Sequence, residues 1–180
     1  RDKRSAWLDA VLRDVFGWGS LFEKGSLASA GIAVFSPDER VRVNPTGALV
    51  IAETPHALVL VVDPQEATLD ANYPDDGWSA SALDRMAAFL RTSESCSVGV
   101  VTDGRWWAVV SAPVGGPVAW GVTDSLAWSE DTQVRDAFAR ILDPRLLNEE
   151  AGIGGHTLPR MFHDSVALAE EVTESLGQQV

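Results

Sequence analysis

The sequence predicts one α/β domain, a mixed sheet flanked by helices, followed by a helical tail. Three observations lead to this class: an amphipathic helical pattern opens the chain, apolar runs separated by turn residues fill the middle, and further helical patterns close it. The 180 residues are enough for one hydrophobic core and too few for a large multidomain enzyme. We assign 1–150 to the α/β domain and 151–180 to a connector and a helix.

The first half of the chain contains one helical pattern and four strand patterns. Apolar residues at helical spacing predict an amphipathic helix over 5–18. Turn residues then separate three short apolar segments, which we expect to form a meander of neighbouring strands. The fourth segment is apolar at every position, as is typical of a central strand that is buried on both faces. The predicted strands are 31–35, 41–43, 48–51 and 57–62.

The second half begins with a helix and a hairpin. Ser79 has the character of a helix cap, and apolar residues at helical spacing carry that helix to about Thr92. Asp103-Gly104 is a strong hairpin signal, which joins a strand before it to a strand after it. One more strand and two helices follow. The predicted elements are strands 97–102, 105–111 and 118–122, and helices 132–142 and 158–178.

Charge and cysteine content exclude several classes of protein. The 14 Lys and Arg against 26 Asp and Glu give a net charge of −12, so long-range attraction of nucleic acid by this chain alone is excluded. Any DNA contact must be local or come from another domain. A single cysteine, Cys96, excludes an internal disulfide and a Cys-rich zinc site, which fits a reducing cytoplasm. No stretch approaches the roughly 20 apolar residues of a membrane span, so we expect no membrane partner.

The chain has two further features with chemical content. His56, His156 and His163 are far apart in sequence, and since zinc needs three or four convergent ligands, we expect no metal site. Trp106 and Trp107 are neighbours on a predicted strand, so they face opposite sides of the sheet. One of them belongs in the core. The other either packs on the sheet or stacks on a base or a partner surface.

The strand order is compatible with a metal-dependent nuclease of the PD-(D/E)XK type. Such an enzyme needs an Asp at one strand and a (D/E)xK on the next, so that two carboxylates hold Mg²⁺ and the lysine orients water. Here Thr46 follows Pro45 where the Asp would stand, and Asp63 and Gln65 give at best an imitation of the second motif. No lysine follows Lys24. We therefore expect a degenerate nuclease-like domain without hydrolytic activity.

Several segments together resemble a known family. They are PTGALV at 45–50, DGWSAS at 76–81, DRM at 84–86, LR at 90–91, GVVTDGRWW at 99–107 and EVTESLGQQV at 171–180. From about residue 40 to its end, the chain resembles the N-terminal region of large adenine-specific DNA methyltransferases of bacterial phage-defence systems. The DISARM type is the most similar, and type IIG restriction-modification and BREX methylases are more distant. The fifth and last segments are specific only as a pair.

The resemblance implies a nuclease-derived domain that lacks catalytic residues. The S-adenosylmethionine site and the NPPY-type catalytic loop would lie further along the polypeptide, so this chain would itself need no cofactor and would be a fragment. Residues 44–47 read NPTG and lack the second proline and the aromatic residue of that loop. The implied function is that of an inert accessory domain that positions DNA or another defence subunit for the methyltransferase. A protein-interaction or scaffold module is the alternative, and a small-molecule enzyme is a weaker third.

Candidate DNA contacts are the arginines of the helix and the hairpin, together with Trp106. Arg85 and Arg91 are six residues apart on one predicted helix, about 120° from facing the same way, so they do not form one compact patch. Arg105 is the best single candidate, because it adjoins a hairpin turn that can reach outward. Its ordinary alternative is a solvated turn arginine.

Overall fold

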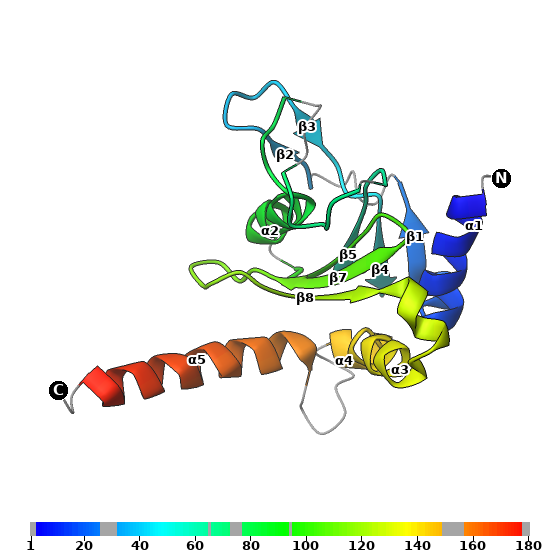
Figure 1. The fold of residues 1–180 in the computed structure, drawn as a ribbon. Coiled ribbons are helices and arrows are strands. Elements are labelled where there is room, and N and C mark those ends of the chain that lie inside the picture. The colour runs from blue at the N-terminus through cyan, green and yellow to red at the C-terminus, as the bar shows by residue number, and fades with distance from the viewer. Residues whose placement is uncertain are drawn as a thin grey trace.

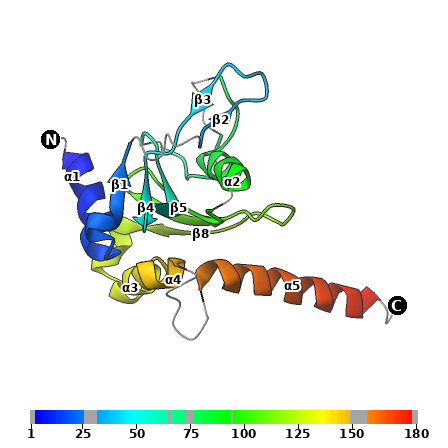
Figure 2. The ribbon, with the colours of Figure 1, turned by 180° about the vertical axis from the view of Figure 1, so that it is seen from behind.

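Figure 1 shows the fold in a computed structural model, which describes residues 3–25, 32–64, 66–72, 77–93, 95–148 and 157–177. A six-stranded sheet in the order β1-β4-β5-β6-β7-β8 forms the centre, and β2 and β3 form a separate two-stranded sheet. Helix α2 lies on one side of the central sheet, and α3, α4 and α5 lie on the other (Figures 1 and 2). The predicted α/β class, with a mixed sheet flanked by helices, is confirmed.

The chain opens with a helix that packs on one edge of the sheet. Helix α1 spans Lys3–Ala10, and a π-helical turn over Val11–Val15 continues it. Trp18 follows in the core, where its Nε1–H donates to the carbonyl oxygen of Leu142 at 2.7 Å and so joins the two ends of the domain. Strand β1, Phe22–Lys24, pairs with β4. The sequence did not predict β1, because three residues are too few to show an alternating pattern.

The predicted meander is wrong in its pairing. Strands β2 (Val34–Phe35) and β3 (Arg42–Val43) pair only with each other, whereas β4 (Gly47–Ile51) pairs with β1 and with β5 (Thr54–Val61). The physical reason is that both edges of β4 are already occupied, by β1 on one side and by β5 on the other, so none is left for β3. The β2–β3 hairpin therefore projects from the body of the domain (Figure 1).

Helix α2, Ala82–Thr92, crosses over between β5 and β6 (Val98–Thr102), which run parallel. Its N-cap is Ser81 and not the predicted Ser79, because only Ser81 has a capping-box partner. Ser81 Oγ accepts from the Asp84 N–H at 3.0 Å, and the Asp84 carboxylate accepts from the Ser81 N–H at 3.1 Å. Since β5 and β6 are parallel, their carboxyl ends and the N-terminus of α2 meet at one edge of the sheet.

The hairpin predicted at Asp103-Gly104 is confirmed: it joins β6 to β7 (Trp106–Ser111), and Gly104 has a φ of 100°. Strand β8, Ala119–Asp124, forms the sheet edge beyond β7. A 3₁₀ turn (Ser125–Ser129) and helices α3 (Thr132–Ile141) and α4 (Pro144–Leu147) close the domain. Helix α5, Leu158–Gly177, is the predicted helical tail and runs outward beyond the sheet (Figure 2).

Two hydrophobic clusters lie on the two faces of the sheet. The cluster on the α2 face includes Leu58, Leu60, Met86, Phe89 and Val101, all buried. The cluster on the other face is aromatic: the Phe16 and Trp107 rings meet edge-on at 5.4 Å, and Trp128 and Phe138 follow at 6.0–6.4 Å. The prediction that 57–62 is a central strand is confirmed for Ala57–Leu60, which are buried.

Candidate functional site

A cleft of about 420 Å³ lies at the edge where β5 ends and α2 begins. Its lining comes from β3, from the residues that lead into β4, from the end of β5 and from α2, and includes Arg42, Asn44, Thr46, Val61, Asp63 and Arg85. In α/β sheets, ligands bind outside the carboxyl ends of parallel strands. This cleft, which we call the carboxyl-edge cleft, therefore has the position of a ligand site.

Two of the predicted degenerate nuclease positions meet in the carboxyl-edge cleft. Strands β4 and β5 are antiparallel, so the start of β4 lies beside the end of β5. Thr46 Oγ1 accepts from the Val61 N–H at 2.9 Å, and Asp63 follows two residues further on, with a side chain that is 91% exposed. Gln65, the third predicted position, lies outside the described residues. The strand arrangement thus places Thr46 and Asp63 in the same cleft.

This lining does not fit a magnesium site of the nuclease type. Mg²⁺ takes oxygen ligands and is held chiefly by carboxylates. Asp63 is the one carboxylate among the described lining residues, while the Thr46 hydroxyl is neutral and already accepts a hydrogen bond from the backbone. Across the described ranges, no three His, Cys, Asp or Glu side chains are grouped so that they could hold a metal ion.

Three arginines surround this edge. Arg4, on α1, donates to the backbone oxygens of Val62 and Asp103, and its Nη1 lies 3.4 Å from the Asp63 carboxylate. It therefore connects the end of β5 to the end of β6. Arg42, on β3, is exposed, and its guanidinium lies 5.9 Å from the centre of the Phe35 ring. The third is Arg85.

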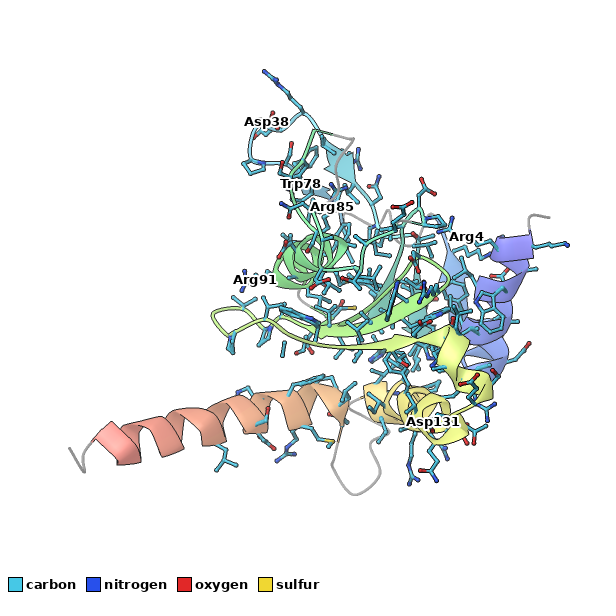
Figure 3. All side chains as sticks on the ribbon, in the orientation of Figure 1. Arg4, Asp38, Trp78, Arg85, Arg91 and Asp131 are labelled. Atoms are coloured by element: carbon cyan, nitrogen blue, oxygen red, sulfur yellow. The ribbon has the colours of Figure 1, made fainter. Side chains whose placement is uncertain are left out.

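Arg85 is only 4% exposed, and its burial contradicts the prediction that it contacts DNA from an exposed helix face. Its Nη2 donates to the Trp78 carbonyl at 2.8 Å and its Nε to the Ala80 carbonyl at 3.3 Å, while the guanidinium lies 5.0 Å from the Trp78 ring centre. Figure 3 shows Trp78 and Arg85 together between α2 and the β2–β3 hairpin. The correction is that Arg85 holds the loop before α2 in place and forms a wall of the cleft.

Arg105 is at the hairpin turn, as predicted, but it is paired. Its Nε and Nη2 bind the Asp124 carboxylate at 3.1 and 2.7 Å, and its guanidinium lies 4.9 Å from the Trp106 ring centre. The hydrogen bonds raise the pKa of Arg105 and lower the pKa of Asp124. Because the Asp124 carboxylate compensates its charge, Arg105 attracts a phosphate group less strongly than an unpaired arginine would.

The prediction that one of the two neighbouring tryptophans belongs in the core is confirmed. Trp107 is fully buried, and Trp106 is half-buried on the other face, where it packs against the α2-side cluster.

Arg91 is exposed at the last turn of α2, and its Nη2 lies 3.4 Å from the Gly116 oxygen in the β7–β8 loop. The structure thus does not bring Arg85, Arg91 and Arg105 together. Two arginines at the cleft are not among the predicted contacts: Arg42, inside the predicted strand 41–43, and Arg4, just before the predicted helix 5–18.

A larger cavity, of about 640 Å³, lies at the other end of β5 and β6, where these two strands begin. Its lining includes His56, Ser93 and Cys96. Cys96 is buried, and its thiol donates to the Pro55 carbonyl at 3.0 Å. Burial raises the pKa of this thiol to about 11. Since the thiolate is the nucleophile, a thiol protonated at neutral pH has the character of a core residue and not of a reactive centre.

Comparison with known proteins does not assign the chain to a family. No family of known proteins matches the chain, and no curated protein or solved structure matches it either. None of the helices in the described part of the chain is long and apolar enough to cross a membrane.

Proposed function

We propose that this chain is a nucleic-acid-positioning domain with a degenerate nuclease fold and no catalytic activity of its own. The observation that carries the proposal is the carboxyl-edge cleft, which is lined by the neutral Thr46, by Asp63 and by the exposed Arg42. A cleft of this kind retains a binding position without the groups needed for hydrolysis.

The strand arrangement supports the nuclease ancestry. The start of β4 and the end of β5 adjoin, and β6 runs parallel to β5 on the far side. This arrangement puts the positions of Thr46 and Asp63 on the lining of one cleft. Because Thr46 replaces one carboxylate and no lysine occurs after Lys24, both the metal and the orienting base are lost.

The local charge supports a phosphate ligand. The whole chain carries −12, but the described lining of the carboxyl-edge cleft has the exposed Arg42 and the buried Arg85 against one acid, Asp63, which pairs with Arg4. The binding expected from so few cations is weak and sensitive to salt, because it depends on the release of counterions from a few phosphates. Such a domain assists DNA that is bound mainly by other domains.

The larger protein that we propose is an adenine-specific DNA methyltransferase of a bacterial phage-defence system, active in the cytoplasm. The sequence resemblance supports this part of the proposal. S-adenosylmethionine would bind in a separate domain of that protein. The partners would be DNA and other defence subunits.

A scaffold module with the same degenerate fold is the second candidate. The observation that favours it is the open edge of β8, where Trp120 and Val122 are exposed. If the carboxyl-edge cleft has no affinity for DNA, this candidate replaces the first.

Arg42→Ala should weaken DNA binding by the chain several-fold at low salt and should reduce the salt dependence, because one phosphate contact is lost. The measurement is fluorescence anisotropy of a labelled duplex across a salt series. Arg40→Ala is the matched control, since Arg40 lies two residues away in the same hairpin and pairs with Asp38 at 3.5 Å. With Mg²⁺ added, the duplex should remain uncut. Equal losses in the two variants would refute a contact at Arg42.

A further inference from the structure

Strand β8 is an open edge of the central sheet. Ala119 to Val122 are all exposed, including the two residues that face the side of α3 and α5, so no described element covers this stretch. The opposite edge is different: β1 has only three residues and includes Glu23 and Lys24. Short, charged edges resist further pairing, whereas a six-residue edge without Pro or Lys is a template for another strand.

The hydrogen-bond pattern shows which backbone groups of β8 are available. The Ser125 N–H donates to the Arg105 carbonyl at 2.9 Å, so this pair lies in the hydrogen-bonded phase of the β7–β8 ladder. Antiparallel ladders alternate in phase. The backbone groups of Thr123, Gly121 and Ala119 therefore face β7, and those of Trp120 and Val122 point outward from the sheet.

The side chains of the same two residues form an apolar strip. Trp120 pairs with Val110 and Val122 with Ala108, so both side chains lie on the α2 face. They are 51% and 42% exposed. Between Ala119 and Thr123 the edge carries no charge, and Asp124, the next residue, is neutralised by Arg105.

We propose that two copies of this chain pair through antiparallel β8 strands about a two-fold axis at Gly121, which joins the two sheets into one. Only residues whose backbone groups point outward can form the new hydrogen-bonded pairs. Trp120 of one copy therefore lies opposite Val122 of the other, and the symmetry repeats this pair on the other side of the axis. Aromatic and β-branched residues form favourable cross-strand pairs. Ala119 lies opposite Thr123, so the whole ladder is uncharged.

The two neighbouring symmetric registers give less favourable cross-strand pairs or a shorter paired strand. An axis at Val122 sets Trp120 opposite Asp124, and so brings a carboxylate into the apolar strip. An axis at Trp120 leaves only 119–121 of the strand paired. The strand is therefore self-complementary in one register, whereas nothing in it selects a different protein. This argument favours a second copy as the occupant.

The first test is the mass of the 180-residue chain by light scattering after gel filtration at about 100 µM, a concentration at which a dimer with a micromolar dissociation constant is well populated. The wild type should have about twice the mass of 19.3 kDa, and Trp120→Lys/Val122→Lys should be monomeric with an unchanged circular dichroism spectrum. Val134→Lys, on α3 and also 42% exposed before substitution, should remain dimeric. A monomeric wild type, or a dimer that survives the double substitution, overturns the proposal.

The second test fixes the register. Gly121 faces its own counterpart in a non-hydrogen-bonded pair, where Cα atoms lie about 4.5 Å apart, within disulfide range. A Cβ at Gly121 meets only Val109 Cγ1 at 3.8 Å, so Gly121→Cys fits the strand. Mild oxidation should link the Gly121→Cys copies. It should not link those of Ala119→Cys, whose counterparts are roughly 13 Å apart. Equal linkage in both variants contradicts this register.

Discussion

Trp107→Ala is expected to lower the free energy of unfolding by about 3–5 kcal/mol, which is a large part of the stability of a domain of this size. Trp107 is fully buried at the centre of the aromatic cluster. Its ring contacts Phe16, next to the end of the N-terminal helical segment, and Trp128, in the turn after β8. Truncation therefore opens a cavity between the sheet and the segments that cover it.

A matched pair of milder substitutions tests the reason for this effect. Trp107 Nε1 finds no hydrogen-bond acceptor among the described residues, whereas the equally buried Trp18 donates its Nε1–H to Leu142. Trp107→Phe removes an unsatisfied donor, so it should cost less than Trp18→Phe, which leaves the Leu142 carbonyl without that bond. Urea unfolding followed by far-UV circular dichroism measures both. A larger loss in Trp107→Phe would be inconsistent with this packing.

Gly99→Ala should cost about 1–3 kcal/mol through overpacking. Gly99 lies on β6 directly beneath α2, and a Cβ there would be 2.2 Å from Met86 Sδ and 2.7 Å from Met86 Cγ. These atoms are not at the tip of the side chain, so Met86 cannot yield by a small rotation. The glycine thus sets how closely α2 approaches the sheet.

A double-mutant cycle isolates the contact between Gly99 and Met86. Met86→Ala alone should cost about 2–5 kcal/mol, and combined with Gly99→Ala it should cost less than the sum of the single substitutions, because the added methyl group enters the vacated space. Gly121→Ala is the control, since its Cβ meets nothing closer than 3.8 Å. Its cost should be within about 0.5 kcal/mol. Additive costs in the cycle would show that the clash is relieved elsewhere.

The strongest local patterns predicted the fold well. The continuous apolar run at 57–62 and the Asp103-Gly104 turn identify β5 and the β6–β7 hairpin, because burial and turn chemistry are encoded within a few residues. The choice of partner strand for β3 and for β4 is not encoded so locally. Strand β4 pairs with β1, a three-residue strand without a recognisable pattern, and this non-local choice could not be read from sequence.

The candidate site was predicted in part. Comparison with the nuclease motif singled out Thr46 and Asp63, and the structure places both in one cleft because β4 begins where its antiparallel neighbour β5 ends. Arg85 was misjudged because helical spacing does not show that Trp78, in the preceding loop, covers its guanidinium. Arg42 lies on a two-residue strand, and only the folded hairpin brings it to the carboxyl-edge cleft.

The most direct test of the central claim is site-specific photo-crosslinking of the chain to a DNA duplex at low salt. A photoreactive amino acid replaces Asn44, which is exposed on the cleft lining, or Val134, which is exposed on α3 across the sheet. If the carboxyl-edge cleft positions DNA, the Asn44 variant should crosslink strongly and the Val134 variant should not. Equal yields at the two positions, or crosslinking only at Val134, would contradict a DNA site in this cleft.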